Sequence, residues 1–419
     1  MDDLISEATL AIDIHKERST APFRHSSPVR LAYAGRGTIN GGMKLENFKA
    51  GKWQQRYQHQ SFEPVPVNLE WTWEDPSINT LLESANRALG ELNAFSLIVP
   101  DIDLFINMHV VKEALSSSRI QGAQIGMHEA LMLEEQIQPE KQSDWRKVQN
   151  NVEAMNSAIA ELAIGPLSNR LLKQIHSLLM KDVRGENTQP SEFRISQNWI
   201  GGSSLADAVF IPPHPDSVQE LMSDLERFWH NDEIRVPHLV KLAISHYQFE
   251  TIHPFLDGNG RIGRLLVPLY LVSHGVLTKP SLYLSDFFER NRTSYYQALR
   301  RVQVSNDLID WVRFFLRGVA ETARKGRDTL RQILILRTEV SQAILRMGKR
   351  TPNARQLLHL LYGNPLVSSN DIKQALGVSE PLARVLIRGF TQLGILEEIT
   401  GQPRWRTHVF DRYLALFSK

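Results

Sequence analysis

The chain has 419 residues, of which 42% are hydrophobic and 22% charged, so it is long enough for two or three globular domains. It contains no cysteine, which excludes disulfide bonds, a thiol nucleophile and cysteine-ligated zinc. No run of about 18 apolar residues occurs, and the start of the chain is acidic where a signal peptide would be basic and then apolar, at Asp2, Asp3, Glu7 and Asp13. We therefore expect a cytoplasmic protein without a membrane span.

The net charge of +2 hides an asymmetry along the chain. Residues 317–419 carry 17 lysines and arginines against 8 acidic residues, whereas the remainder carries 31 against 38. A basic C-terminal part on an acidic body is typical of nucleic-acid binding. An unevenly charged, solvated surface explains the same numbers equally well.

Helical periodicity dominates the chain, which predicts an all-α fold. Residues 1–42 lack it and are predicted to be a disordered extension. We expect an N-terminal helical region over 43–165, a helical body carrying the main motif over 166–336 and a separate domain over 337–419. Apolar residues at three- and four-residue steps predict helices over residues 77–95, 101–117, 127–136, 145–163, 169–180, 215–230, 237–251, 265–275, 280–290, 293–302 and 307–336. Residues 193–215 read instead as short strands around a glycine-bearing turn, which predicts a small β-hairpin.

The last domain has a different pattern. Helices are expected over 355–362, 369–376 and 380–393, followed by a hairpin of 396–399 and 405–410 across the turn 401–403. This order is that of a winged helix. Arg384 and Arg388 lie one turn apart on its third helix, where they could contact DNA. A protein–protein module of the same fold, with ordinary surface arginines, is the alternative.

The stretch 253–264, His-Pro-Phe-Leu-Asp-Gly-Asn-Gly-Arg-Ile-Gly-Arg, is the most informative part of the chain. A glycine-rich loop that opens a helix presents backbone N–H groups and the positive end of the helix dipole, which together suit phosphate. Gly258 and Gly260 let the backbone approach an anion without a Cβ in the way. The stretch therefore predicts a nucleoside triphosphate site.

The charged side chains of this stretch also suit a nucleoside triphosphate site. Asp257 offers a hard oxygen ligand of the kind that holds Mg²⁺ on a polyphosphate. Arg261 and Arg264 are three residues apart on the new helix, share a face and could neutralise terminal phosphates. His253 is the candidate general base that activates a hydroxyl. The alternative, a mere tight turn at 257–260, leaves the fixed register of these four residues unexplained.

Residues 253–264 match the signature of the Fic (filamentation induced by cAMP) family, and the resemblance covers roughly residues 75–320 together with the C-terminal winged helix of one bacterial branch. It implies an all-helical domain that transfers AMP from ATP onto a Ser, Thr or Tyr hydroxyl of a protein, the chain itself included. The motif glycines fit the AMP-transferring members better than the phosphorylating Doc branch.

The resemblance also implies roles for single residues. His253 would deprotonate the target hydroxyl, Asp257 would hold Mg²⁺, and the arginines would grip the β- and γ-phosphates of ATP. The α-phosphate would lie on Gly258, Asn259 and Gly260. The remaining nucleotide-binding candidates are Phe255 and Gly263 of the motif and, on the adenine side, Tyr283, Asn291, Tyr295 and Tyr296. Each of the last four is equally explained as a core aromatic or a cap. The hairpin at 200–211 resembles the family flap, which aligns a target segment by strand addition.

One position departs from the family pattern. Many members inhibit themselves through a helix reading Ser/Thr-x-x-x-Glu-Gly/Asn, and residues 117–122 fit it except that Gln121 replaces the glutamate. In the family that glutamate pairs with the arginine equivalent to Arg264. A glutamine keeps the shape but loses the charge, and charge-assisted hydrogen bonds are roughly twice as strong as neutral ones. We therefore expect Ser117 and Gln121 to mark a weakened inhibitory helix; a purely structural helix is the alternative.

Two further hypotheses stay open. The chain could be a DNA-binding regulator whose body only senses nucleotide, in which case DNA binding would depend on salt and on Arg384 and Arg388. The motif fixes a phosphate site but not the base, so a different nucleotide or phosphoryl donor is also open. The partners expected are a protein with a modifiable hydroxyl, DNA in the second hypothesis and a second copy if the chain is a homo-oligomer.

Overall fold

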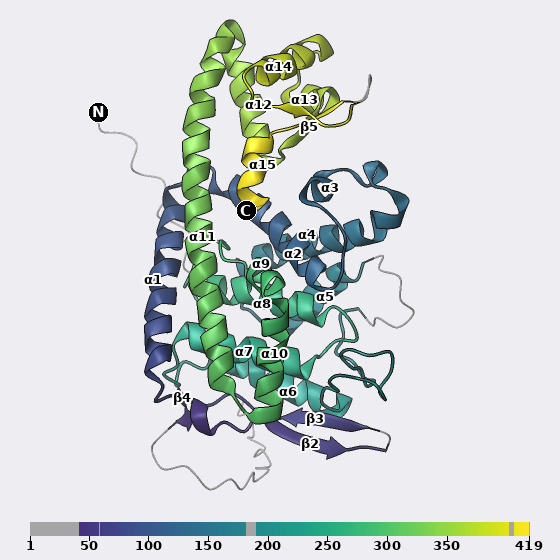
Figure 1. Ribbon diagram of the computed structural model, residues 1–419, viewed down its shortest axis with the longest axis vertical. Coiled ribbons are helices and arrows are strands. Elements are labelled where there is room, and N and C mark those ends of the chain that lie inside the picture. The colour runs from purple at the N-terminus through teal and green to yellow at the C-terminus, as the bar shows by residue number, and fades with distance from the viewer. Residues whose placement is uncertain (1–41, 58, 182–189, 402–405, 419) are drawn as a thin grey trace, which may run out of the picture. The chain divides into compact units, whose positions relative to one another are not determined.

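The computed structural model describes residues 42–57, 59–181, 190–401 and 406–418, and helices dominate it (Figure 1). Up to residue 343 these helices are α1 (Pro76–Ile98), α2 (Ile102–Ile120), α3 (Met127–Leu131), α4 (Gln142–Leu162), α5 (Asn169–Leu179), α6 (Pro215–His230), α7 (His238–Ile252), α8 (Asn259–Ser273), α9 (Ser285–Arg290), α10 (Arg292–Ser305) and α11 (Leu308–Ala343). The predicted all-α class is confirmed. Of the predicted extension, residues 1–41 lie outside the described part. None of the helices in these ranges is both long and apolar enough to cross a membrane.

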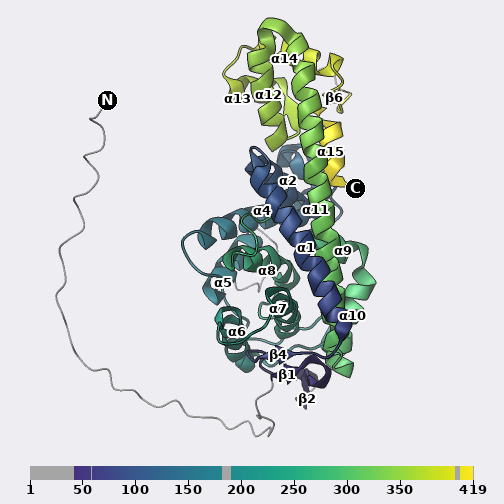
Figure 2. The same ribbon diagram turned by 90° about the vertical axis from the view of Figure 1, so that its left-hand side faces the viewer.

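The two long helices α1 and α11 pack side by side (Figures 1 and 2). A polar contact accompanies their apolar seam, because Arg313 Nε of α11 donates to Ser77 Oγ of α1 at 2.8 Å. Arg337 Nη2 of α11 lies 2.8 Å from Oδ2 of Asp101, the residue that precedes α2. Helix α11 continues through residue 336 to Ala343 without a break. The domain boundary predicted at 336/337 therefore falls inside a helix and remains a prediction.

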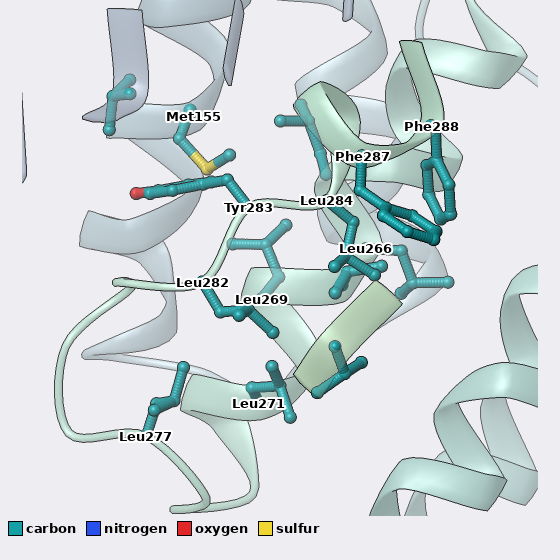
Figure 3. Packing of buried hydrophobic residues seen from close by; sticks show 14 of the residues in the cluster. Met155, Leu266, Leu269, Leu271, Leu277, Leu282, Tyr283, Leu284, Phe287 and Phe288 are labelled. Carbon is teal, nitrogen blue, oxygen red and sulfur yellow. The ribbon is translucent and has the colours of Figure 1, made fainter. Parts of the chain in front are cut away.

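Helix α8 lies at the centre of the core. Its side chains are buried from Ile262 through Leu271, and those of α7 are buried almost throughout. Figure 3 shows α8 packed against the segment that follows it and against α4 and α9, through Met155, Leu266, Leu269, Leu271, Leu277, Leu282, Tyr283, Leu284, Phe287 and Phe288. The loop between α7 and α8 is thus carried by two rigid helices.

The helix predicted over 280–290 is wrong in its first half, because α9 begins only at Ser285. Residues 280–284 run in non-helical conformation and bury four side chains in succession after Pro280. Glu113 of α2 accepts hydrogen bonds from both the backbone N–H and the hydroxyl of Ser285, which fixes the start of the helix. A carboxylate far away in sequence supplies this cap, so local periodicity does not reveal it.

Short strands flank the helices. β1 (Met43–Lys44) pairs in parallel with β4 (Trp71–Thr72), and β2 (Gly51–Gln55) forms an antiparallel hairpin with β3 (Gln60–Pro64) that the sequence did not predict. The hairpin predicted within 193–215 is present as a single antiparallel bridge between Ile200 and Phe210. Phe62 N of β3 donates to Ile211 O at 2.9 Å, so the β2–β3 hairpin supports this flap.

After α11 and a 3-10 turn over Ile344–Arg350, the chain forms a further group of elements. Its helices are α12 (Thr351–Gly363), α13 (Ser369–Leu376), α14 (Glu380–Gln392) and α15 (Asp411–Ser418), and its sheet has the order β5 (Leu366–Ser368), β7 (Thr407–Val409), β6 (Glu397–Glu398). The three predicted helices and the two predicted strands occur in the predicted order as α12, α13, α14, β6 and β7, whereas β5 and α15 were not predicted. Residues 402–403 of the predicted turn and residue 405 of the predicted second strand lie outside the described part. The winged-helix assignment itself stays a prediction.

Candidate active site

The motif begins where α7 ends. His253 takes the left-handed conformation, with φ 50° and ψ 60°, and its N–H donates to Phe249 O at 3.0 Å as the helix terminates. Left-handed backbone is uncommon for a residue other than glycine and persists only where neighbours enforce it. The conformation turns the chain out of α7 and into the loop that precedes α8.

Two side chains from the segment before the flap enforce that turn. Arg194 is buried, and its Nε donates to His253 O at 2.9 Å while its backbone N–H donates to Pro254 O at 2.9 Å. Asn198 Nδ2 donates to Phe255 O at 2.7 Å. A cation at the C-terminus of a helix is also favoured by the helix dipole. Sequence reasoning missed both residues, since the only signal nearby was the strand-like pattern of the segment.

The ring of His253 is half-buried and has one nitrogen fixed. Nδ1 lies 3.3 Å from Glu250 O, and because a carbonyl only accepts hydrogen bonds, Nδ1 carries the proton of the neutral ring. Nε2 then has a free lone pair. Burial, followed by the positive charge of Arg194, lowers the pKa of His253 to about 4. The ring is therefore neutral near pH 7 and can accept a proton at Nε2.

Asn259 holds the loop closed. Its Oδ1 accepts from Phe255 N and its Nδ2 donates to Phe255 O, both at 2.7 Å. The side chain is buried, so both of its polar groups are committed to the loop backbone. Gly258, at φ 78°, provides the N-cap position of α8. The first N–H groups of the helix have no intrahelical acceptor and face the loop opening, as at any helix N-terminus.

A second histidine supports the loop from α5. His176 stacks on Phe255 with ring centroids 4.1 Å apart, and its Nε2 lies 3.2 Å from Asp257 O. Ser191 N donates to its Nδ1 at 3.2 Å, which makes Nε2 the protonated nitrogen. Burial lowers the pKa of His176 to about 4, so it is neutral and structural. Sequence reasoning assigned Phe255 but not its partner.

Arg261 carries an unsatisfied positive charge next to the loop. It is 3% exposed, and its nearest carboxylate, Asp257 Oδ2, is 3.9 Å from Nη2. Nη2 also points at Met180 Sδ at 3.6 Å, a weak acceptor. Within the described residues, neither Nε nor Nη1 has a hydrogen-bond partner. Burying a guanidinium without acceptors is costly, so the site is built to receive an anion here.

Arg264 is bound to α2. Its Nε donates to Ser117 Oγ at 2.8 Å and its Nη2 donates to Ser117 O at 3.0 Å, and both residues are buried. The structure thus joins the predicted inhibitory helix to the second motif arginine, through the serine. Gln121 ends α2 as an exposed C-cap residue. Its Nε2 lies 3.6 Å from where a Cβ on Gly260 would be, so its amide borders the loop.

Asp257 is the most exposed of the motif side chains, at 58%. Its Oδ1 accepts from Gly258 N at 2.6 Å, and the remaining oxygen lone pairs face the opening. One accessible carboxylate suits Mg²⁺, which is usually held by one or two carboxylates together with substrate phosphates. No group of three or more histidine and acidic side chains with metal-binding geometry occurs in the described ranges. A protein-only metal cage is therefore not present there.

Unlike the motif residues, the four adenine-side candidates do not lie together at the loop between α7 and α8. Tyr295 is buried and its hydroxyl lies 3.0 Å from His246 Nε2, while His246 Nδ1 donates to Gly263 O at 2.9 Å. Tyr295 therefore fixes α8 from within the core. Tyr283 is also buried, with its ring 6.5 Å from and stacked on that of His109 in α2.

Asn291 and Tyr296 differ from these two tyrosines. Asn291 joins α9 to α10 and donates from Nδ2 to Phe287 O at 2.9 Å. Tyr296 is exposed. A nucleotide contact by any of the four residues stays a prediction.

Two family models match the part of the chain that contains this site. Residues 79–160 match the Fic/DOC family N-terminal region, and residues 166–271, which include the whole motif, match the Fic/DOC family. The matched regions run from within α1 to within α8 and leave out residues 161–165, which include the end of α4.

Curated relatives and a solved structure agree with these matches. Protein adenylyltransferase Fic of Drosophila erecta is 29% identical over 198 residues, covering 45% of this chain and 36% of the relative. The protein of the same name from Drosophila melanogaster is 30% identical over 180 residues, covering 41% and 33%. The chain thus spans about a third of the length of these relatives. A Fic family protein from Desulfovibrio desulfuricans G20 has the same fold with a TM-score of 0.51 at 22% identity, over 80% of this chain and 96% of that one.

Proposed function

The chain belongs to the Fic/DOC family through residues 79–271, and from this premise we propose that it is a protein adenylyltransferase. It transfers AMP from ATP to a Ser, Thr or Tyr hydroxyl of a protein, including its own. The observation that carries the proposal is Arg261, whose buried guanidinium has two nitrogens without acceptors in the described part of the chain, beside the loop. The name of the Drosophila relatives supports the same activity.

The geometry suggests how the residues divide the work. ATP phosphates supply the acceptors that Arg261 lacks, and the N–H groups of Gly260 and its neighbours at the start of α8 bind the α-phosphate. The N–H of Gly258 already donates to Asp257 Oδ1, so Gly258 contributes by letting the backbone turn into α8. Since the carboxamide of Asn259 is already bonded to Phe255, Asn259 acts on the phosphate by shaping the loop. Asp257 holds Mg²⁺, which neutralises phosphate charge when bound.

The chemical step needs one base and one leaving group. His253 Nε2 accepts the proton of the target hydroxyl, whose oxygen attacks the α-phosphorus of ATP. The bond from that phosphorus to the bridging oxygen breaks, and pyrophosphate leaves. The flap around Ile200 and Phe210, carried by β3, aligns the target segment beside His253.

Arg264 sets how often the γ-phosphate is held productively. In this structure its hydrogen bonds go to Ser117, so ATP must compete with α2 for this arginine. Gln121 presents a neutral amide at the loop where the family glutamate would present a carboxylate. We infer that inhibition persists through Ser117 and is weaker than in members that carry the glutamate.

Labelled ATP tests the proposed reaction against the open alternative of phosphoryl transfer. Purified chain is incubated with Mg²⁺ and either α-³²P- or γ-³²P-ATP, then denatured and separated from free nucleotide. AMP transfer leaves label on protein only with the α-labelled donor. Label from the γ position instead would show phosphorylation and reject the proposal.

A second function, DNA binding, is favoured by one feature of α14. Arg384 and Arg388 are both exposed on it one turn apart. Arg384 forms an ion pair with Glu380 at 3.0 Å, whereas Arg388 has no ion pair among the described residues. We propose that these side chains contact DNA phosphates. Fluorescence anisotropy with duplex DNA over a salt series tests this, and Arg388→Ala should lower the salt slope by about one. The exposed Arg87→Ala on α1 serves as the control. Equal slopes for both variants would reject DNA contact by α14.

A further inference from the structure

A polar cavity lies away from the motif, between α2, the segment leading into α9, and α11. Its volume is about 40 Å³, which exceeds what one water molecule needs. All the side chains that line it are polar, Gly326 apart, and they come from three separate parts of the chain; among them are Lys112, Ser281, Tyr283, Asp286, Thr322 and Lys325. Figure 3 shows Tyr283 with its hydroxyl directed away from the leucines of α8.

The inner end of the cavity is rich in hydrogen-bond donors. The hydroxyls of Ser281, Tyr283 and Thr322 are all buried, and none has a hydrogen-bond partner among the described residues. Buried polar groups are nearly always paired, so three unpaired hydroxyls in one cavity call for a common partner. An oxyanion can accept from all three at once, because it has several acceptor oxygens and no donor.

The outer end carries excess positive charge. Lys325 Nζ lies 2.7 Å and Lys112 Nζ 3.8 Å from the carboxylate of Asp286, so two ammonium groups share one carboxylate. Arg290 also reaches Asp286, at 3.4 Å, but has Glu321 as a second partner. The side chains of Lys112 and Lys325 are 18% and 31% exposed, which gives the cavity an entrance from solvent.

The remaining ionisable groups reduce this charge only in part. Glu113 also lines the cavity, where Ser285 engages its carboxyl, and burial raises its pKa to about 7, so at pH 7 it carries less negative charge than an ordinary glutamate. Burial, with Lys112 beside it, lowers the pKa of His109 to about 3, so this ring is neutral. Burial, opposed by the carboxylate of Asp286 and reinforced by the nearby charge of Lys325, lowers the pKa of Lys112 to about 8.

We propose that this cavity binds a small oxyanion of about the size of inorganic phosphate. The lysines attract and pair with the anion, and the three hydroxyls bind its inner oxygens. The site lies on α2, one turn and a half before Ser117, the residue that binds Arg264. An anion bound there holds α2 against α9 and α11. Because Ser117 of α2 binds Arg264, the anion also stabilises the helix that restrains this arginine.

Calorimetry on the full chain tests this site without turnover. Inorganic phosphate is titrated into the protein at pH 7 without nucleotide, in a chloride buffer of constant ionic strength. We expect saturable binding that Lys325→Met and Thr322→Val each weaken by about tenfold, the loss of one charge-assisted or well-placed hydrogen bond. Lys147→Met on α4, a lysine with a partly exposed ion pair away from the cavity, should leave the affinity unchanged.

Two controls keep the result specific. Arg261→Gln removes phosphate binding at the motif, so binding that survives in this variant belongs to the cavity. Thr322→Val is isosteric and removes a hydroxyl that has no partner, so it should leave the melting temperature without phosphate unchanged. Absence of saturable binding, binding lost with Arg261→Gln, or binding indifferent to Lys325 and Thr322 would overturn the proposal and leave a hydrated cavity.

Discussion

At the scale of single residues, the contact between Arg264 and Ser117 is the restraint that we propose for the motif. It joins two buried side chains from helices 147 positions apart in sequence, through the serine hydroxyl and the serine carbonyl. Ser117→Ala removes the hydroxyl and leaves the carbonyl. We expect this change to raise the rate of self-AMPylation by about threefold to tenfold, the effect of about 0.7–1.4 kcal/mol for one hydrogen bond.

The neighbouring serine offers a matched control. Ser118 is also buried on α2, and its hydroxyl has no hydrogen-bond partner among the described residues. Ser118→Ala should therefore leave the labelling rate unchanged. If both variants label at the rate of the wild type, Ser117 does not restrain Arg264.

Gln121 gives a second residue-scale prediction, which concerns charge. The amide of Gln121 borders Gly260. The Nη1 atom of Arg264 lies 3.0 Å from the position that a Cβ added to Gly260 would take. Gln121→Glu places a carboxylate within reach of that guanidinium and should lower self-AMPylation, because a charge-assisted hydrogen bond competes better with ATP. Gln121→Gly should not lower it. Equal rates for wild type and Gln121→Glu would show that this position no longer takes part in inhibition.

At the scale of elements, the close approach of α7 and α8 positions the motif. A Cβ on Gly263 would lie 2.2 Å from Glu250 Oε1 and 3.1 Å from Phe249 Cδ1. Gly263→Ala should therefore push the helices apart and lower the free energy of unfolding by about 1–3 kcal/mol. It should also lower the rate of labelling, since α7 and α8 position both the proposed base, His253, and the loop that binds phosphate.

A glycine-to-alanine substitution in α1 should instead stabilise the protein. Gly90 lies inside α1, is exposed and has no atom within 4 Å of its Cβ position. Gly90→Ala should raise the free energy of unfolding by roughly 0.5–1 kcal/mol, the difference in helix propensity. Urea unfolding of both variants checks the pair. A neutral Gly263→Ala would mean that α7 and α8 can separate without cost.

The elements also show what a sequence can and cannot reveal. Most helices and the loop at 253–264 were predicted, because apolar spacing and glycine placement are local signals. The β2–β3 hairpin, the late start of α9 and the supports Arg194, Asn198 and His176 were not. The β2–β3 pairing itself is local in sequence. Its contact to the flap and the other features depend on partners far along the chain, such as Ile211 for Phe62 or Glu113 for Ser285. No pattern within one segment carries that information.

At the scale of the whole molecule, buried ionisable groups make stability depend on pH. Burial lowers the pKa of His246 to about 3, below the ordinary value of 6.5. Folding thus favours the neutral ring, and the stability it contributes is present above pH 6.5 and is lost as pH falls toward 3. Between pH 7 and pH 5 this loss is about 2 kcal/mol for one such histidine.

Comparing the pH dependence of stability between variants separates the contribution of His246 from that of the other ionisable groups. His246→Gln should lose about 2 kcal/mol less than wild type between pH 7 and pH 5, measured by urea unfolding. Glu250 provides the control of opposite sign, because burial raises its pKa to about 7 and its contribution grows as pH falls. Glu250→Gln should therefore lose more than wild type. Parallel pH profiles for all three proteins would contradict the assignment.

We propose that the loop at 253–264 transfers AMP with His253 as the base. Mass spectrometry of the chain after incubation with ATP and Mg²⁺ tests this proposal most directly. The wild type should gain the mass of AMP on a Ser, Thr or Tyr residue. His253→Ala should gain none while keeping the melting temperature and the ATP affinity of the wild type. An added group other than AMP, or undiminished AMP transfer by a folded His253→Ala, would contradict the claim.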